Sequence, residues 1–267
     1  MELVTILLSG LTALLSLTGV VVDKNIEAAF RSQIDRAEEL QVRTDNAPAH
    51  QIINGKIDKV RVAGRGLWVT KDLRLDTLEI ETDPIAVNLS ALQADGQTPR
   101  ASSLGQPIQA AIRLKLNEGD LNNFLKSPSA IAQLQSMTTR TLGGAAASSL
   151  NKDYQITNPQ VKFLANNRLG LSAELKDPGS GETLAVKLET GVGVIGGRKF
   201  QLVEPTATVG GTQVPPFLLA GLTTGIGDRL NVDMLEQRGL STRILQFKVN
   251  PQQLELAAFV RISGKQE

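Results

Sequence analysis

The chain has 267 residues, and its 28 Lys and Arg nearly balance its 27 Asp and Glu, giving a formal net charge of +1. Such a balance lacks the basic excess of nucleic-acid-binding proteins, and 7 Phe, 1 Trp and 1 Tyr are too few for base-stacking platforms, so we expect no nucleic-acid partner. The absence of Cys excludes disulfides, thiolate zinc sites and Cys nucleophiles, and a single His excludes a poly-His metal site.

An uncharged apolar segment comes first in the chain. Residues Leu3–Val22 contain no Asp, Glu, Lys or Arg, and twenty residues of helix span about 30 Å, the thickness of a hydrocarbon core. We predict that residues 1–22 form an apolar membrane anchor, with a signal peptide and a buried helix of the fold as the alternatives. The absence of a basic residue before the segment disfavours the signal peptide. The basic residues that follow favour a cytoplasmic position for the rest of the chain, namely Lys24, Arg31, Arg36 and Arg43.

The remainder, residues 23–267, is expected to form a single domain, because strand and helix patterns interleave without a long polar linker. Its first part predicts an amphipathic helix of about 18 residues from Asp23. This helix either packs on the core or lies on a membrane surface. Its apolar positions recur at three- and four-residue spacing: Ile26, Ala29, Phe30, Ile34, Ala37 and Leu40.

After Pro48 the pattern changes to that of strands. The alternation of apolar residues slips by one position within Ile57–Val62 and within Leu73–Ile80, as a β-bulge would cause. Ile108–Leu116 alternates strictly and is the clearest strand. Asn117 is placed to cap a helix.

Two helices are predicted next. The first carries an apolar stripe of Leu121, Phe124 and Leu125, and Ser127-Pro128 ends it. The second runs from Ser129 to about Ser149, and its stripe includes Ile131 and Leu134.

The C-terminal part repeats this change from strands to a helix. Pro215-Pro216 suits a first helical turn, and a closing hairpin is predicted around Asn250-Pro251. The whole order predicts an α+β architecture with mainly antiparallel pairing. The predicted strands are Val161–Leu164, Leu169–Leu175, Leu184–Leu188, Phe200–Val203 and Ala207–Val209, and the apolar stripe of the helix is Phe217, Leu218, Leu222, Ile226 and Leu230.

Catalytic motifs are scarce. Gly191, Gly193 and Gly196 match G-x-G-x-x-G, but a strand pattern follows where a dinucleotide site needs a helix, so a glycine-rich strand or hairpin is favoured. Neither a nucleophile elbow nor a Walker A loop is present in the sequence. We therefore expect no enzyme activity and no cofactor.

A cationic stretch is the clearest polar feature. It contains Lys56, Lys59, Arg61, Arg65, Lys71 and Arg74. One interpretation is the solvated face of two strands; the other is a site for anionic lipid headgroups or a membrane-facing patch.

Four short motifs follow the apolar N-terminus and the amphipathic helix, namely IINGKI, DPIAVN, LNEGDLN and VGGTQVPPF. In this order they resemble the bacterial LmeA-type family of phospholipid-binding proteins, long described as a domain of unknown function. The resemblance covers roughly Asp23–Val260. It implies a tubular lipid-binding fold, in which a curved, mainly antiparallel sheet wraps long helices around an apolar tunnel.

The resemblance also implies a function, which is non-enzymatic phospholipid binding or transfer through an apolar cavity at a bacterial membrane, in the cell envelope. The alternatives are a structural or interaction protein of the envelope without a ligand, and an enzyme acting on lipids or glycans. Together with the aliphatic stripes, it indicates lipid contacts at Ile112, Leu114, Leu121, Phe124, Leu125, Ile131, Leu134, Phe217, Leu218, Leu222 and Ile226, and headgroup contacts at Lys56, Lys59 and Arg61.

Overall fold

The computed structural model describes residues 27–28, 30–47, 56–86, 106–141, 154–217, 219, 231–233, 236 and 240–262. The predicted anchor, residues 1–22, lies outside this part of the chain, and so does most of the helix predicted after Pro215-Pro216. The described residues form two compact units, which we treat separately. Unit 1 contains residues up to Leu116 together with 232–246 and 255–267, and unit 2 contains 117–231 and 247–254.

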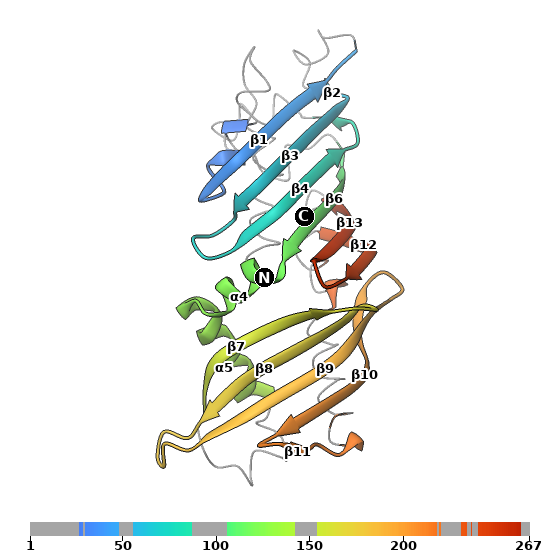
Figure 1. Cartoon of the computed structure of the whole chain (residues 1–267). Helices are drawn as coiled ribbons and strands as arrows, with labels where there is room; N and C mark the ends of the chain where they lie inside the picture. The colour runs from blue at the N-terminus through green and yellow to red at the C-terminus, as the bar shows by residue number, and fades with distance from the viewer. Residues whose placement is uncertain are drawn as a thin grey trace. The chain divides into compact units, whose positions relative to one another are not determined.

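Antiparallel strands dominate the described part of the chain (Figure 1). A six-stranded sheet has the order β1-β3-β4-β6-β13-β12, a five-stranded sheet has the order β11-β10-β9-β8-β7, and β2 pairs with β5. The strands are β1 (Arg36–Asp45), β2 (Lys56–Ile57), β3 (Lys59–Trp68), β4 (Arg74–Thr82), β5 (Ile85–Ala86), β6 (Ile108–Asn117), β7 (Gln155–Leu164), β8 (Arg168–Lys176), β9 (Thr183–Ile195), β10 (Lys199–Val209), β11 (Thr212–Gln213), β12 (Leu240–Val249) and β13 (Gln253–Ile262).

The predicted fold class, an α+β fold with a sheet wrapped around long helices, is wrong. The two named helices in the described residues are α4 (Glu118–Leu125), of 8 residues, and α5 (Pro128–Thr141), of 14 residues. The amphipathic helix predicted from Asp23 to about Leu40 is also wrong in its second half, because β1 begins at Arg36. Pairing with β3 places Leu40 on the buried face, so strand pairing overrides the helical spacing.

Several elements were predicted correctly. The strand at Ile108–Leu116 is β6, and Asn117 holds the N-cap position of α4, although its side chain makes no capping hydrogen bond. The closing hairpin is formed by β12 and β13, and the glycine-rich segment lies in β9 and the turn that follows it.

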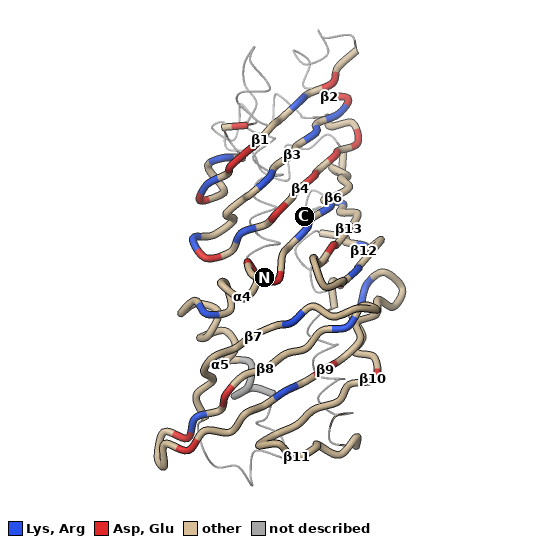
Figure 2. Tube along the Cα trace, in the orientation of Figure 1, with Lys and Arg blue, Asp and Glu red and all other residues tan. Residues whose placement is uncertain are grey.

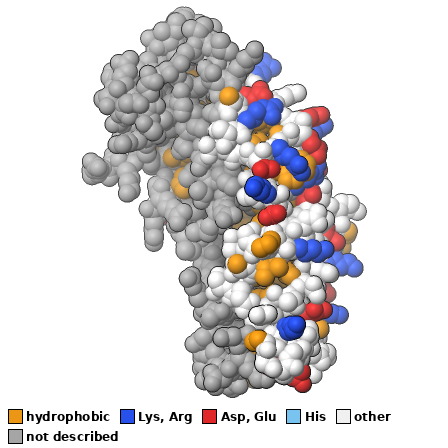
Figure 3. All heavy atoms as spheres, turned by 90° about the vertical axis from the view of Figure 1, so that its left-hand side faces the viewer, with side chains coloured by type: hydrophobic (Ala, Val, Ile, Leu, Met, Phe, Trp, Pro, Cys, Tyr) orange, Lys and Arg blue, Asp and Glu red, His pale blue; other side chains and the backbone are white. Residues whose placement is uncertain are grey.

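The six-stranded sheet has one apolar and one charged face. Register places Leu40, Gly64, Leu78 and Leu114 in one row, with the apolar residues of the next row on the same side. On the other face the sign of the charge changes from strand to strand, because β3 carries cations, β4 carries carboxylates and β6 carries cations again (Figure 2). Charges of both signs lie near one another in the space-filling view (Figure 3). The residues are Lys59, Arg61 and Arg65 of β3, Glu79 and Glu81 of β4, and Arg113 and Lys115 of β6. The second apolar row is Val42, Val62, Ile80 and Ile112.

A glycine, rather than a bulge, accounts for the slip within Leu73–Ile80. The β3–β4 pairs keep one register from Arg61–Glu81 to Trp68–Arg74. Gly66 has a φ of 54°, and this left-handed residue brings the Leu67 side chain over Gly64, where a Cβ would lie 2.6 Å from Leu67 Cδ1. The slip within Ile57–Val62 is a break between two strands, since β2 ends before Asp58.

Side-chain amides take the place of a neighbouring strand in unit 2. β7 is the edge of the five-stranded sheet, and Asn122 of α4 bonds both the N–H and the C=O of Val161, each at 2.8 Å. Gln135 of α5 accepts from the Ile156 N–H at 2.9 Å and donates to the Tyr154 carbonyl at 2.5 Å. The two helices therefore satisfy backbone groups that an open edge would present to another chain.

Asn122→Ala should destabilise the protein by about 1–3 kcal/mol, because two partly buried backbone groups of Val161 lose their partner. The measurement is urea denaturation. Asn123→Ala is the matched control, since Asn123 is the exposed neighbour on α4 and the change in helix propensity is the same. Equal effects of the two substitutions would contradict this role of Asn122.

Glu81 gives a second prediction, which concerns pH. Hydrogen bonds from Lys59 and then Arg61 hold the pKa of Glu81 below its usual value of 4.5. A lowered pKa in the folded state stabilises the fold above the unfolded-state pKa, and this contribution is lost as the pH falls through the folded-state pKa. The melting temperature of the wild type should therefore exceed that of Glu81→Gln at neutral pH. This difference should disappear in acid. A difference that persists in acid would refute this assignment.

Candidate functional site

An apolar face on the five-stranded sheet is the candidate lipid-binding surface. In β9, the even-numbered residues from Leu184 to Val194 share this side, and register joins them to apolar residues of β7, β8 and β10. One row is Val161, Leu171, Leu188 and Ala207, and another is Ala173, Val186 and Val209. We call this surface the apolar face of unit 2.

One part of the apolar face is closed. Val161, Phe163 and Val249 form a buried cluster, against which α4 and the tip of the β12–β13 hairpin pack. The rings of Phe200 and Phe247 meet edge to face, with centroids 5.2 Å apart. The other side chains packed on this cluster are Leu121, Leu125, Leu169 and Leu254.

The other part of the apolar face is open. Leu171 is 40 % exposed, and Leu184 and Val209, which lie toward the ends of their strands, are each 37 % exposed. Leu184 also reaches the β10–β11 turn, where a Cβ on Gly210 would lie 3.5 Å from Leu184 Cδ2. Three large apolar side chains of one sheet face are thus left in contact with solvent, and we call them the open patch.

Asn167, the residue just before β8, forms hydrogen bonds that hold the closed part together. Asn167 has a φ of 57°, and its side chain donates to the Phe247 carbonyl at 3.4 Å and accepts from the Val249 N–H at 2.8 Å. This pair of bonds fixes the hairpin tip to the β7–β8 turn. The closed part is therefore held by polar bonds as well as by apolar contact.

The residues predicted as lipid contacts fall into three groups. Leu121, Phe124 and Leu125 of α4 and Ile131 and Leu134 of α5 are half-buried in unit 2. Ile112 and Leu114 are half-buried on the apolar face of the six-stranded sheet in unit 1. Phe217 is 74 % exposed, and the last three predicted contacts lie outside the described residues, namely Leu218, Leu222 and Ile226.

The predicted headgroup residues lie in unit 1, and two of them are paired with carboxylates. Lys59 Nζ is 2.6 Å from Glu81 Oε1, and Arg61 bonds both Glu81 at 3.0 Å and Asp45 at 2.7 Å. Lys56 is exposed on β2. The positive charge of this stretch is thus largely compensated by residues of neighbouring strands.

Sequence reasoning missed the open patch as a unit. Leu171 and Leu184 were assigned to strands but not to the lipid site. The period-two alternation of Leu169–Leu175 and Leu184–Val194 was the available signal, because it marks one sheet face as apolar.

Metal-binding clusters and membrane-spanning helices are both absent from the described part of the chain. No group of three or more His, Cys, Asp or Glu in that part of the chain is arranged to hold a metal ion. Among the helices of the same residues, none has the length and apolar character needed to cross a membrane.

Comparison with known proteins places the chain in a family. A model of the LmeA-like phospholipid-binding family matches residues 13–259. The match covers most of the chain, so the protein belongs to the LmeA-like phospholipid-binding family. Searches of curated proteins and of solved structures gave no match.

Proposed function

We propose that this member of the LmeA-like phospholipid-binding family binds a phospholipid whose acyl chains lie on the open patch of unit 2. The carrying observation is the exposure of Leu171, Leu184 and Val209 on one sheet face. Each acyl methylene removed from water there contributes about 0.8 kcal/mol, so contact with part of one chain supplies ample gross affinity. The family description, which names phospholipid binding, supports this choice of ligand.

The proposal also includes the other apolar residues that the sequence predicts as lipid contacts. Phe124 of α4 and Ile131 and Leu134 of α5 are half-buried, so they retain surface that a lipid chain could cover. Leu121 and Leu125 back the closed part of the same face. Ile112 and Leu114 are proposed as contacts on the apolar face of unit 1, and Phe217, Leu218, Leu222 and Ile226 as contacts after β11.

We propose binding and transfer at a bacterial membrane of the cell envelope rather than catalysis. A lipid held on a solvent-accessible patch can exchange with a bilayer without a cavity having to open. The proposal invokes no bond making or breaking and no cofactor.

The combined change Leu171→Glu and Leu184→Glu should lower the phospholipid that co-purifies with the full chain by at least about tenfold. A carboxylate buried against an acyl chain costs about 2 kcal/mol or more. The measurement is native mass spectrometry together with a melting curve. Both side chains are already partly exposed, so the fold should tolerate the changes.

Ile195→Glu is the matched control, because Ile195 is 52 % exposed but its side chain is on the side of β9 opposite to Leu184. It should leave the bound lipid unchanged. Well-folded wild-type protein that carries no lipid and exchanges none with phospholipid vesicles would overturn the proposal and favour a structural role in the envelope.

We also propose that Lys56, Lys59 and Arg61 contact anionic headgroups of a bilayer surface. Each Lys or Arg near such a surface contributes about 1 kcal/mol. In this protein Glu81 competes for two of the three cations. A headgroup would therefore have to displace that carboxylate or bind beside it.

This competition gives a test by gain of function. Glu81→Gln should strengthen binding to vesicles containing phosphatidylglycerol, because it releases Lys59 and removes one of the two carboxylates that Arg61 bonds. Lys56→Gln should weaken binding. The measurement is vesicle co-sedimentation at low and high salt. Glu79→Gln is the matched control, since it removes the same negative charge from the same strand but affects Arg113, which keeps its bond to Glu255. An equal gain with both variants would exclude a specific role for Lys59 and Arg61.

A further inference from the structure

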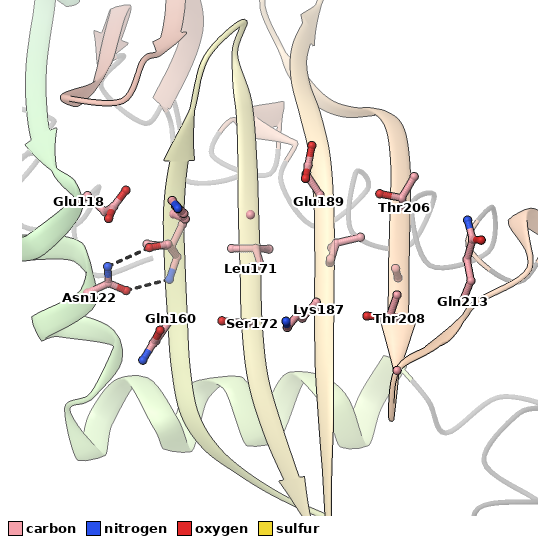
Figure 4. Close-up of a pocket in the computed structure, with 16 residues that line it drawn as sticks. Glu118, Asn122, Gln160, Leu171, Ser172, Lys187, Glu189, Thr206, Thr208 and Gln213 are labelled. Atoms are coloured by element: carbon pink, nitrogen blue, oxygen red, sulfur yellow. Dashed lines mark hydrogen bonds between the residues drawn. The ribbon is translucent and has the colours of Figure 1, made fainter.

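A groove of about 960 Å³ lies at the five-stranded sheet, and its polar lining is on the other side of the sheet from the apolar face. The groove is also bordered by one apolar row, namely Val161, Leu171, Leu188 and Ala207. We call it the polar groove after the side chains on its polar side. Register places one row of its lining across five strands, and Figure 4 shows that row together with α4 at the side. The row is Gln160, Ser172, Lys187, Thr208 and Gln213, and the adjacent row is Lys162, Gly170, Glu189 and Thr206.

The floor of the groove consists of small residues on β8. Gly170 and Ser172 are two positions apart on the same side of that strand. Lys162 of β7 stands opposite Gly170, and Lys187 of β9 stands opposite Ser172. Because neighbouring strands are about 4.8 Å apart, the two lysines flank the β8 floor from both sides, within reach of one small anion above it.

The carboxylates of the lining are already engaged. Glu118 Oε2 accepts from the Phe163 N–H at 2.6 Å, and Glu189 Oε1 is 3.0 Å from Arg168 Nε. Lys162 and Lys187, in contrast, form no ion pair with any residue that the structure describes. The uncommitted groups of the groove are therefore two ammonium groups and several hydroxyl and amide groups.

We propose that this groove binds a phosphorylated polyol. The phosphate lies over Gly170 between Lys162 and Lys187, and the polyol hydroxyls bond Thr206, Thr208 and Gln213. Charge-assisted bonds from two ammonium groups favour a phosphate over a neutral polyol. The same chemistry is presented by a free sugar or glycerol phosphate and by the headgroup of a glycerophospholipid, and the experiment separates these two sources.

Gly170→Val is the principal variant, because it fills the floor without removing a charge. A Cβ at Gly170 would lie 3.6 Å from Lys162 Cβ, an ordinary contact, and a β-branched residue suits a strand. Gly193→Val is the matched control. Gly193 is on the side of β9 that also carries Lys187, but it lies outside the groove. A Cβ at Gly193 would lie 3.6 Å from Val203 Cγ2. Lys162→Gln with Lys187→Gln tests the charges.

The probes are sn-glycerol 3-phosphate, glycerol, and phosphatidylglycerol vesicles, each titrated calorimetrically into the full chain. We expect sn-glycerol 3-phosphate to bind and glycerol not to bind. Gly170→Val and the double lysine variant should each weaken binding at least about tenfold, and Gly193→Val should leave it unchanged. The same pattern seen with the vesicles alone would support the proposal and identify the lipid headgroup as the source.

Binding of either phosphate probe that is unaffected by Gly170→Val and by the lysine changes would overturn the proposal, as would no binding of either. The outcome is distinguishable from that of the acyl-chain proposal, because that proposal is assayed by co-purified lipid and its variant includes Leu184, which does not line the groove. A groove variant that keeps its lipid while losing sn-glycerol 3-phosphate would separate the two sites.

Discussion

The two faces of the five-stranded sheet stay distinct because β7 and β10 each contain one extra residue. Register advances by three residues from Thr157 to Gln160 and from Val203 to Thr206, while the partner strand advances by two. Side chains alternate with a period of two, so without these bulges the apolar residues on either side of each bulge would point in opposite directions. The residue before a proline holds a left-handed φ in both, at Asn158 and Glu204.

This constraint determines what unit 2 presents to its surroundings. One side of the sheet carries the open patch, and the other carries the polar groove floored by Gly170 and Ser172. The edge at β7 is closed by amide side chains of Asn122 and Gln135, which occupy backbone groups that another strand would need. The proposed lipid site and the proposed phosphate site both depend on this separation.

In unit 1 the same alternation produces an apolar side and a side on which charges pair across strands. Glu81 bonds Lys59 and Arg61. Arg113 bonds Glu255 and, more weakly, Glu79, and these carboxylates raise the pKa of Arg113. A run of cations in sequence is therefore no measure of the local field, because β4 and β1 bring carboxylates beside it. An anionic group that bonds Lys59 or Arg61 there either displaces a carboxylate or shares the cation with it.

The sequence by itself determined the strands with strict alternation, the start of α4 at Asn117 and the hairpin of β12 and β13, because each depends on local periodicity or turn chemistry. It also carried the family resemblance. It did not predict β1, because the apolar residues in and before this strand are spaced as in a helix. Pairing with β3 makes the segment a strand and places Leu40 and Val42 on one face. Only the tertiary structure decided that Leu171, Leu184 and Val209 share an open patch and that Lys162 and Lys187 flank one floor. It also decided that Lys59 and Arg61 both pair with Glu81. These relations join residues on different strands, and strand register, which long-range pairing and the two bulges set, is not encoded in any one segment.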